Sequence, residues 1–215
     1  RPINPVTVVR SDSSFVVRSP DGGASQTVTM VSMLLVSYRI SKGLPLAPFV
    51  RLGVVHQDGG GTTGGGLTNP AVGASYLLQP IGALKLNLFL GLTVPIGMGG
   101  GNSPAPAAAA AMRGGVHARS AMDNAMFAIN DFTIFPGLGL AYSAWGFTAQ
   151  LEATVLQLIR VRGELASPDA SKTNFTCGGH LGYFVADWLS FGAELRYQRW
   201  LSTPKAVTTE ALRDT

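Results

Sequence analysis

Residues 84 to 96 read Leu84-Lys85-Leu86-Asn87-Leu88-Phe89-Leu90-Gly91-Leu92-Thr93-Val94-Pro95-Ile96. Every even position holds a branched aliphatic side chain, and the odd positions hold a mixed set that includes Lys85, Asn87 and Thr93. Because successive side chains of a β-strand point to opposite faces, this alternation predicts a strand with one hydrocarbon face and one partly polar face. In a soluble sheet the leucines would face a core, whereas in a membrane barrel they would face lipid and the mixed face would line a lumen.

The composition favours a membrane. The chain has 215 residues, of which 27 are glycine and only 13% are charged, about half the share usual in soluble domains. Its mean hydropathy is nevertheless positive, at +0.25. No stretch reaches the roughly twenty apolar residues that a membrane-spanning helix needs. A hydrophobic chain without such a stretch indicates membrane-spanning strands, here in a single domain over residues 1–215.

Several classes of site and partner gain no support. The chain starts at Arg1 without an apolar leader, so we expect any export signal to have been removed. The single cysteine, Cys177, excludes an internal disulfide. The net charge of +4 is spread along the chain, which argues against a nucleic-acid partner. His56, His117 and His180 lack the spacing of paired ligands, so we expect no metal site and no cofactor.

The alternation recurs in seven other segments, which are residues 27–40, 46–57, 69–79, 131–143, 146–160, 174–186 and 189–201. Residues 1–26 are less regular, and 5–9 with 15–18 are interpreted as one strand interrupted at Ser11–Ser14. The predicted fold class is all-β, an antiparallel up-and-down transmembrane β-barrel with about 8 to 10 strands visible. Bacterial barrels have even strand numbers and residues 202–215 look like a polar loop, so we expect a missing C-terminal strand and about 10 to 12 strands in the full chain.

The connections alternate in length. Short ones are expected at 41–45, 80–82, 144–145 and 186–188, and long ones at 58–68, 97–130, 163–173 and from 202 onward. Outer-membrane barrels sort their connections in this way, with short periplasmic turns and longer extracellular loops. Tyrosine and tryptophan near the strand ends are expected to form interfacial girdles, although core aromatics that fall near turns are the alternative. They are Tyr38, Tyr76, Tyr142, Trp145, Tyr183 and Trp188 near the short turns, and Tyr197 and Trp200 near the opposite end.

The two faces of the strands differ in chemistry. The face opposite the aliphatic side chains is predicted to line a lumen, with Arg39, Arg51, Lys85, Asn87, Gln150, Glu152, Arg160, Arg162, His180, Glu194 and Arg196. These charges form either an aqueous path with a positive bias or an internal salt-bridge network that fills the barrel. The same face carries glycines, which leave room either for water or for rings such as Phe49, Phe89, Phe135 and Phe184.

Two segments carry a resemblance, Gly179-His180-Leu181-Gly182-Tyr183-Phe184 and Phe191-Gly192-Ala193-Glu194-Leu195-Arg196-Tyr197. With the sorted loops and aromatic belts, they make residues 27–201 resemble bacterial outer-membrane β-barrel proteins of the porin-like type. The resemblance implies a location in the bacterial outer membrane, with outer-membrane lipid and small solutes as partners. Such proteins end in a strand that finishes with an aromatic residue, and this chain ends at Thr215, which again implies a truncated C-terminus.

His180 and Glu194 are predicted neighbours across a three-residue turn that pairs 185 with 189. A hydrolase triad is disfavoured because Ser190 would lie about 13 Å along the strand from Glu194, so no enzymatic activity is expected. The loop 97–130 is either a constriction folded into the lumen, with Arg113, His117, Arg119 and Asp123, or a disordered external loop.

Three functions follow from these expectations. The leading one is a passive pore or narrow channel for small solutes in the outer membrane. The second is a non-conducting structural or interaction barrel of the same membrane. The third is a soluble β-barrel that binds an apolar ligand, which requires the leucine face to point inward.

Overall fold

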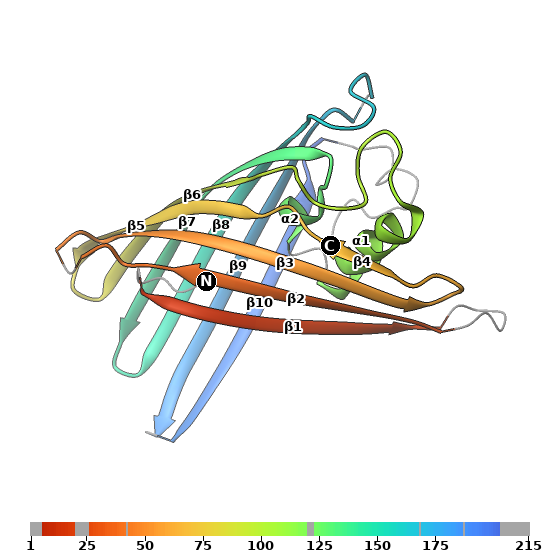
Figure 1. Cartoon of the computed structure of the whole chain (residues 1–215). Coiled ribbons are helices and arrows are strands. Elements are labelled where there is room, and N and C mark those ends of the chain that lie inside the picture. Colours follow the sequence, from red (N-terminus) through yellow and green to blue (C-terminus); the bar gives the residue numbers. More distant parts are fainter. Residues whose placement is uncertain are drawn as a thin grey trace.

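The computed structural model describes residues 6–19, 26–41, 43–119, 123–167, 169–186 and 188–202. Its strands are β1 (Val8–Arg18), β2 (Thr27–Ser37), β3 (Leu46–Gly59), β4 (Gly64–Leu67), β5 (Ala71–Ile81), β6 (Leu84–Thr93), β7 (Asp131–Ala144), β8 (Phe147–Arg160), β9 (Ser171–Ala186) and β10 (Leu189–Trp200). All but β4 follow one another in chain order in a single antiparallel sheet, and β4 pairs with the end of β3. The sheet curls into a half-barrel, with two helices on its concave side (Figure 1).

The expected strands are confirmed. Each alternating segment contains one strand, and most ends agree within about three residues. The N-terminal segment is more regular than expected, because β1 is continuous from Val8 to Arg18 and Ser13 pairs with Ser32 of β2. Pro5, at the start of the expected interrupted strand, lies outside the described residues.

The sheet is open rather than closed. Within the described residues, β1 pairs with β2, β10 pairs with β9, and no pairing joins β1 to β10. Closing a barrel requires the two edge strands to find partners along their whole length. The all-β, antiparallel, up-and-down architecture is therefore confirmed as a half-barrel, and the loop expected beyond Ser202 lies outside the described residues.

The connections are sorted as expected in part. One end of the sheet, the short-turn end, carries residues 38–45, 82–83, 145–146 and 187–188, of which 42 and 187 are not described. The other end, the long-loop end, carries the long connections 94–130 and 161–170, of which 120–122 and 168 are not described. The long loop expected at 58–68 was wrong, because β3 continues to Gly59 and β4 pairs back onto it after a turn at residues 60–63. The turn between β7 and β8 is Trp145-Gly146, one residue later than expected. Both residues have positive φ, 52° and 77°, as in the type I′ turns that match strand twist.

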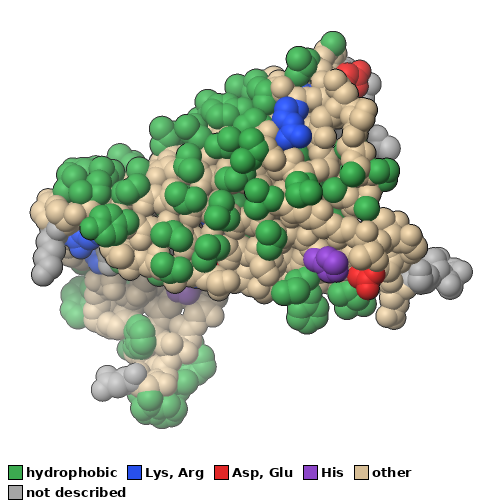
Figure 2. All heavy atoms as spheres, viewed as in Figure 1, with side chains coloured by type: hydrophobic (Ala, Val, Ile, Leu, Met, Phe, Trp, Pro, Cys, Tyr) green, Lys and Arg blue, Asp and Glu red, His purple; other side chains and the backbone are tan. Residues whose placement is uncertain are grey.

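The convex face of the sheet carries the aliphatic side chains. Leu90, in the middle of β6, is 51% exposed, and the aliphatic residues at alternate positions of the neighbouring strands are exposed with it. Figure 2 shows hydrophobic side chains over this face, with the charged side chains in view lying toward its ends. Other exposed members include Val28, Met30, Leu34, Val36, Val50, Leu52, Val54, Val72, Leu88, Leu138, Leu140, Leu151, Val155, Leu181 and Leu195.

The concave face is shaped by phenylalanine and glycine in directly opposed pairs. Phe89 of β6 pairs with Gly137 of β7, and two further pairs repeat the arrangement, Gly91 with Phe135 and Phe49 with Gly73. A Cβ atom on Gly137 would lie 2.1 Å from Cζ of Phe89, so each ring lies over the bare backbone of the opposed glycine. Such pairs relieve crowding on the inner side of a strongly curved sheet and fill it with rings.

The connection between β6 and β7 folds into the half-barrel. It contains α1 (Pro106–Ala118) and α2 (Asn124–Phe127), and neither has both the length and the apolar composition of a membrane-spanning helix. The buried side of α1 carries Ala108, Ala111, Met112 and Gly115, the spacing of one helical face. This face and α2 join a buried cluster with Val31, Val55, Leu156, Leu158 and other inward side chains of the sheet. The loop thus packs against the concave face, and the expectation of a disordered external loop was wrong. That the loop constricts a lumen stays a prediction.

Gly137→Ala tests the ring-over-glycine packing. The added methyl group would overlap Phe89, and we expect a loss of stability of about 1 to 3 kcal/mol. Gly139→Ala is the matched control, on the same strand and face, because no atom lies within 3.8 Å of its added Cβ. Urea unfolding followed by tryptophan fluorescence measures both variants, and equal midpoints would contradict this packing.

Candidate functional site

The strand register gathers the predicted lumen residues into two neighbouring rows across the concave face. Directly opposed residues of β6 to β10 form the first row, which runs Lys85, Ala141, Gln150, His180, Glu194. The second row runs Asn87, Gly139, Glu152, Gly178, Arg196. The alternation of glycine with polar side chains in the second row leaves space between the polar groups.

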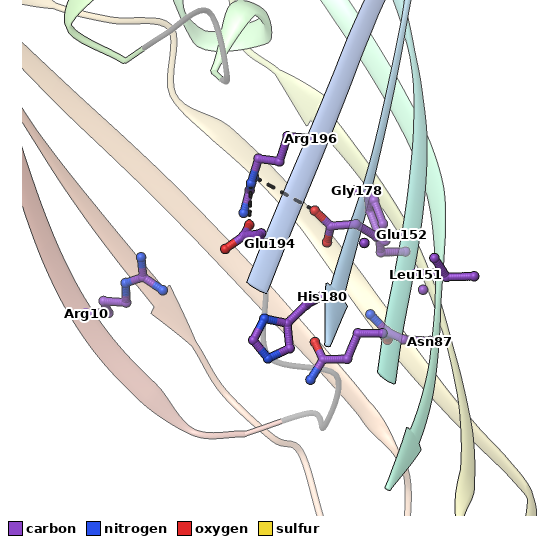
Figure 3. A pocket seen from close by; sticks show the side chains of 12 residues that line it. Arg10, Asn87, Leu151, Glu152, Gly178, His180, Glu194 and Arg196 are labelled. Carbon is purple, nitrogen blue, oxygen red and sulfur yellow. Dashed lines mark hydrogen bonds and ion pairs between the residues drawn. The ribbon is translucent and has the colours of Figure 1, made fainter. Parts of the chain in front are cut away.

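Except for Lys85 and Ala141, the residues of these rows form one wall of a hollow with a volume of about 340 Å³. Arg10 of β1 lies across from β8, β9 and β10 and forms part of the opposite side (Figure 3). Phe89 and Gly139 belong to the same lining. The hollow lies nearer the short-turn end, whereas the buried cluster around α1 and α2 occupies the long-loop end.

The charges of the hollow are compensated within the protein. The guanidinium of Arg196 donates a hydrogen bond to Glu194 at 2.5 Å and lies 3.9 Å from a carboxylate oxygen of Glu152. On the opposite side, Arg10 donates to Asp12 at 2.9 Å. Two arginines and two glutamates therefore line the hollow, which favours the salt-bridge alternative over a path biased toward anions.

Three further polar side chains of the hollow make no hydrogen bond to another described residue. Asn87 is only 6% exposed, and its buried Oδ1 atom has no hydrogen-bond partner among the described residues. Gln150 and His180 pair directly across β8 and β9, and no hydrogen bond joins either side chain to another described residue. Gln150 and His180 can bond to something that enters the hollow, and Asn87 can present its oxygen there after its side-chain amide rotates.

The expected neighbourhood of His180 and Glu194 is observed, but it does not form a catalytic arrangement. The two residues are directly opposed, although the turn pairs 186 with 189 and an irregularity after Leu189 restores the register. The imidazole lies toward the glycine pair Gly182 and Gly192, where an added Cβ would come within 3.1 and 3.2 Å of the ring. Ser190 is opposed to Phe184. It lies at the start of β10 near the short turn, four residues before Glu194.

A chain of ion pairs anchors the inserted segment to the wall. Asp123, just before α2, accepts from Arg51 of β3 at 2.5 Å and from Arg119, just after α1, at 2.8 Å. Arg119 also donates to Asp12 of β1 at 3.1 Å, and Asp12 accepts from Arg10. Five charged groups thus connect β1, β3 and both helices in one network. The network reaches the hollow at Arg10.

Asp123 is nearly buried, and its environment lowers its pKa. Burial alone would raise the pKa of this carboxyl group, but the charges of Arg51 and Arg119 and the hydrogen bonds from both outweigh it. Asp123 is therefore ionised at neutral pH, where both arginines are charged. Of the four residues predicted to form a constriction, Arg119 and Asp123 belong to this network. Arg113 and His117 do not, because they are exposed on α1.

The remaining lumen candidates serve other contacts. Arg160 and Lys172 bind the buried carboxylate of Asp131 at 3.1 and 2.7 Å. Arg162 donates to the carbonyl oxygens of Pro95 and Gly97, and Arg39 donates to that of Ser41. These arginines stabilise loops at the two ends of the sheet and do not line the hollow.

The aromatic residues expected at the short-turn end lie there. Trp145 and Trp188 are the most exposed of them, at 89% and 84%, and the tyrosines Tyr38, Tyr76, Tyr142 and Tyr183 lie on the convex side or at its margin. Tyr197 also points outward. Trp200 was assigned wrongly, because it packs against the buried cluster on the concave face. Trp200 has an even number on β10, as Glu194 and Arg196 do, and this parity already predicts that the three side chains share the concave face.

Two parts of the site were missed from the sequence. Arg10 and Asp12 went unnoticed because the serines at 11, 13 and 14 obscure an alternation in which Val9, Phe15 and Val17 face outward. The packing of α1 was also missed, although a proline in its first turn precedes an alanine-rich stretch with a helical stripe.

No protein-family model, curated protein or solved structure matches this chain. In the described part of the chain, no group of three or more His, Cys, Asp and Glu side chains converges on a common point. What the hollow does must therefore follow from the polar groups that line it.

Asp123→Asn tests the anchoring network through its pH dependence. Because the folded-state pKa of Asp123 lies below its ordinary value of 3.8, the carboxylate stabilises the fold above that pH. This contribution is lost as the pH falls through the folded-state pKa. At pH 7 we expect the variant to lose about 2 kcal/mol, less than for a fully buried pair because both arginines retain some exposure.

Urea unfolding of the wild type and the variant from pH 7 to pH 2.5 measures this effect, and the difference between them should shrink in acid. Glu164→Gln, at an exposed position in the β8–β9 loop, is the control. A difference that stays constant with pH would contradict a role for the charge of Asp123.

Proposed function

We propose that this chain forms part of the wall of an outer-membrane β-barrel that acts as a narrow channel for small solutes. The inserted segment with α1 and α2 narrows the channel at the long-loop end, and the hollow lies on the path of the solute. The observation that carries the proposal is the sidedness of the sheet, with aliphatic side chains outward and polar groups on the concave side.

The convex face supports a lipid contact. Exposed aliphatic side chains cover it from strand to strand, and an aqueous surface of this size would be an aggregation hazard. Hydrocarbon is the solvent in which such a face is stable. The edges of β1 and β10 would then need partners, because unpaired backbone groups are costly in lipid, and closure of the barrel is part of the proposal.

The sorted connections and the aromatic residues at the short-turn end support the same orientation in a membrane. In barrels of the porin-like type, the short turns are periplasmic and the aromatic rings lie at the headgroup level. We place the short-turn end in the periplasm on this basis.

The two alternatives differ in their support. A soluble barrel for an apolar ligand needs open leucine surface on the concave side. Here the exposed leucines of the strands are on the convex side, and the concave Leu156 and Leu158 are buried against the inserted segment. A non-conducting barrel is favoured by one observation, the well-packed contact of α1 and α2 with the inner wall. It remains the second candidate, and conductance separates it from the first.

Leu90→Arg tests whether the convex face meets lipid. At the middle of a membrane-spanning strand, the arginine should cost about 2 to 4 kcal/mol of folding stability in lipid vesicles. Ile81→Arg is the control at the short-turn end, where the cost near an interface falls to about 0 to 1 kcal/mol. Folding yield in vesicles, read by urea titration, measures both. If the fold is soluble, Leu90→Arg leaves stability in detergent-free water nearly unchanged.

Single-channel recording in planar bilayers tests conduction. The wild type should give small steps, and removal of residues 99–125 should increase them, because the inserted segment then no longer narrows the lumen. Deletion of Glu164–Ala166, exposed residues of the β8–β9 loop, is the control and should leave the step size unchanged. A flat baseline from both the wild type and the 99–125 deletion at all voltages would reject the channel.

A further inference from the structure

The hollow has a specific chemical preference, which follows from its compensated charges. The charges of the lining already have counter-charges within the protein, in the pairs that Arg196 makes with two glutamates and Arg10 makes with Asp12. These pairs are partly exposed, so their main effect is to leave the hollow with little net charge to attract a charged solute. The lining therefore offers little to a net anion or a net cation and is compatible with a neutral ligand.

The uncompensated groups define what the ligand must supply. Asn87 of β6 and His180 of β9 line the hollow (Figure 3). Gln150 of β8 belongs to the same lining and is directly opposed to His180. Rotation about its Cβ–Cγ bond lets Asn87 present either its donor or its acceptor, and amide and neutral imidazole side chains both donate and accept. The Oδ1 atom of Asn87 is buried without a partner, and after this rotation it accepts a hydrogen bond from a donor in the hollow. Hydroxyl groups meet this requirement because each of them donates and accepts.

The shape of the hollow admits such a ligand. A Cβ on Gly139 would meet no atom within 3.8 Å, and Gly178 adds a second bare position in the same row. The volume of about 340 Å³ lies within the range of about 300 to 1,000 Å³ typical of small-molecule sites. Phe89 supplies apolar surface at the edge of the hollow, against which the C–H groups of a sugar ring can pack.

We propose that the hollow binds small neutral polyhydroxylated solutes, of the size of a monosaccharide, through Asn87, Gln150 and His180. This inference rests on the proposed channel, since it names the class of solute that the channel admits.

Saturation-transfer NMR with D-glucose as the probe tests the site, with the purified full chain in detergent. We expect saturable binding that weakens about tenfold in Asn87→Leu and in Gln150→Leu, the effect of losing about one net hydrogen bond each. Gln79→Leu, at an exposed position outside the hollow, is the matched control and should bind as the wild type does. Gly139→Leu fills the hollow from its open backbone position and should abolish the signal.

Stability measurements keep the variants interpretable. Asn87→Leu removes a buried oxygen without a partner, so its urea midpoint should be no lower than that of the wild type. Weaker glucose binding together with an unchanged or higher midpoint is the result that a purely structural role of Asn87 would not produce.

Competition by sodium glutamate and by lysine hydrochloride tests the selectivity. Neither compound should displace glucose when each is added at the glucose concentration that half-saturates the site. Displacement by either one, absence of a saturable glucose signal, or equal binding by wild type and the Gly139→Leu variant overturns the proposal. Different results reject the two proposals. Glucose binding without conductance rejects the channel and supports the binding site. Conductance without glucose binding supports the channel and rejects the binding site.

Discussion

The structure depends on the side of the sheet to which its aliphatic side chains point. In a strand the period of two admits only two choices, and most leucines and valines of the strands lie exposed on the convex face. The concave face carries charges, amides, glycines and rings, and its aliphatic side chains, such as Leu156 and Leu158, are buried where the inserted segment covers them. The rest of the interior is therefore filled largely without aliphatic side chains.

That space is filled in two different ways along its length. At the long-loop end, rings lie over glycines and a helix with a stripe of small residues packs against them, so the interior is dry and close-packed. At the short-turn end, Gly139 and Gly178 have no ring opposite them, and the polar rows keep an open hollow. Glycine thus produces close packing where a ring lies opposite it and free volume where no ring does.

Ion pairs join the two ends. Asp12 bonds both to Arg10, which lines the hollow, and to Arg119, which holds the inserted segment. Buried carboxylates such as Asp123 and Asp131 each contact two cationic side chains, which offsets the cost of removing their charge from water. Half of the predicted lumen cations are neutralised within the protein. Arg51 and Arg160 pair with these buried carboxylates, and Arg196 pairs with glutamates of the hollow.

By itself the sequence determined every strand except β4 and the face of nearly every strand residue, because both follow from local alternation. It also placed His180 beside Glu194, since face parity restricts the register. Only the tertiary structure decided the open half-barrel, the inward packing of α1, the inward face of Trp200 and the pairing of Arg51 and Arg119 with Asp123. These depend on contacts between segments far apart in the chain, and alternation along one strand carries no information about what lies opposite it.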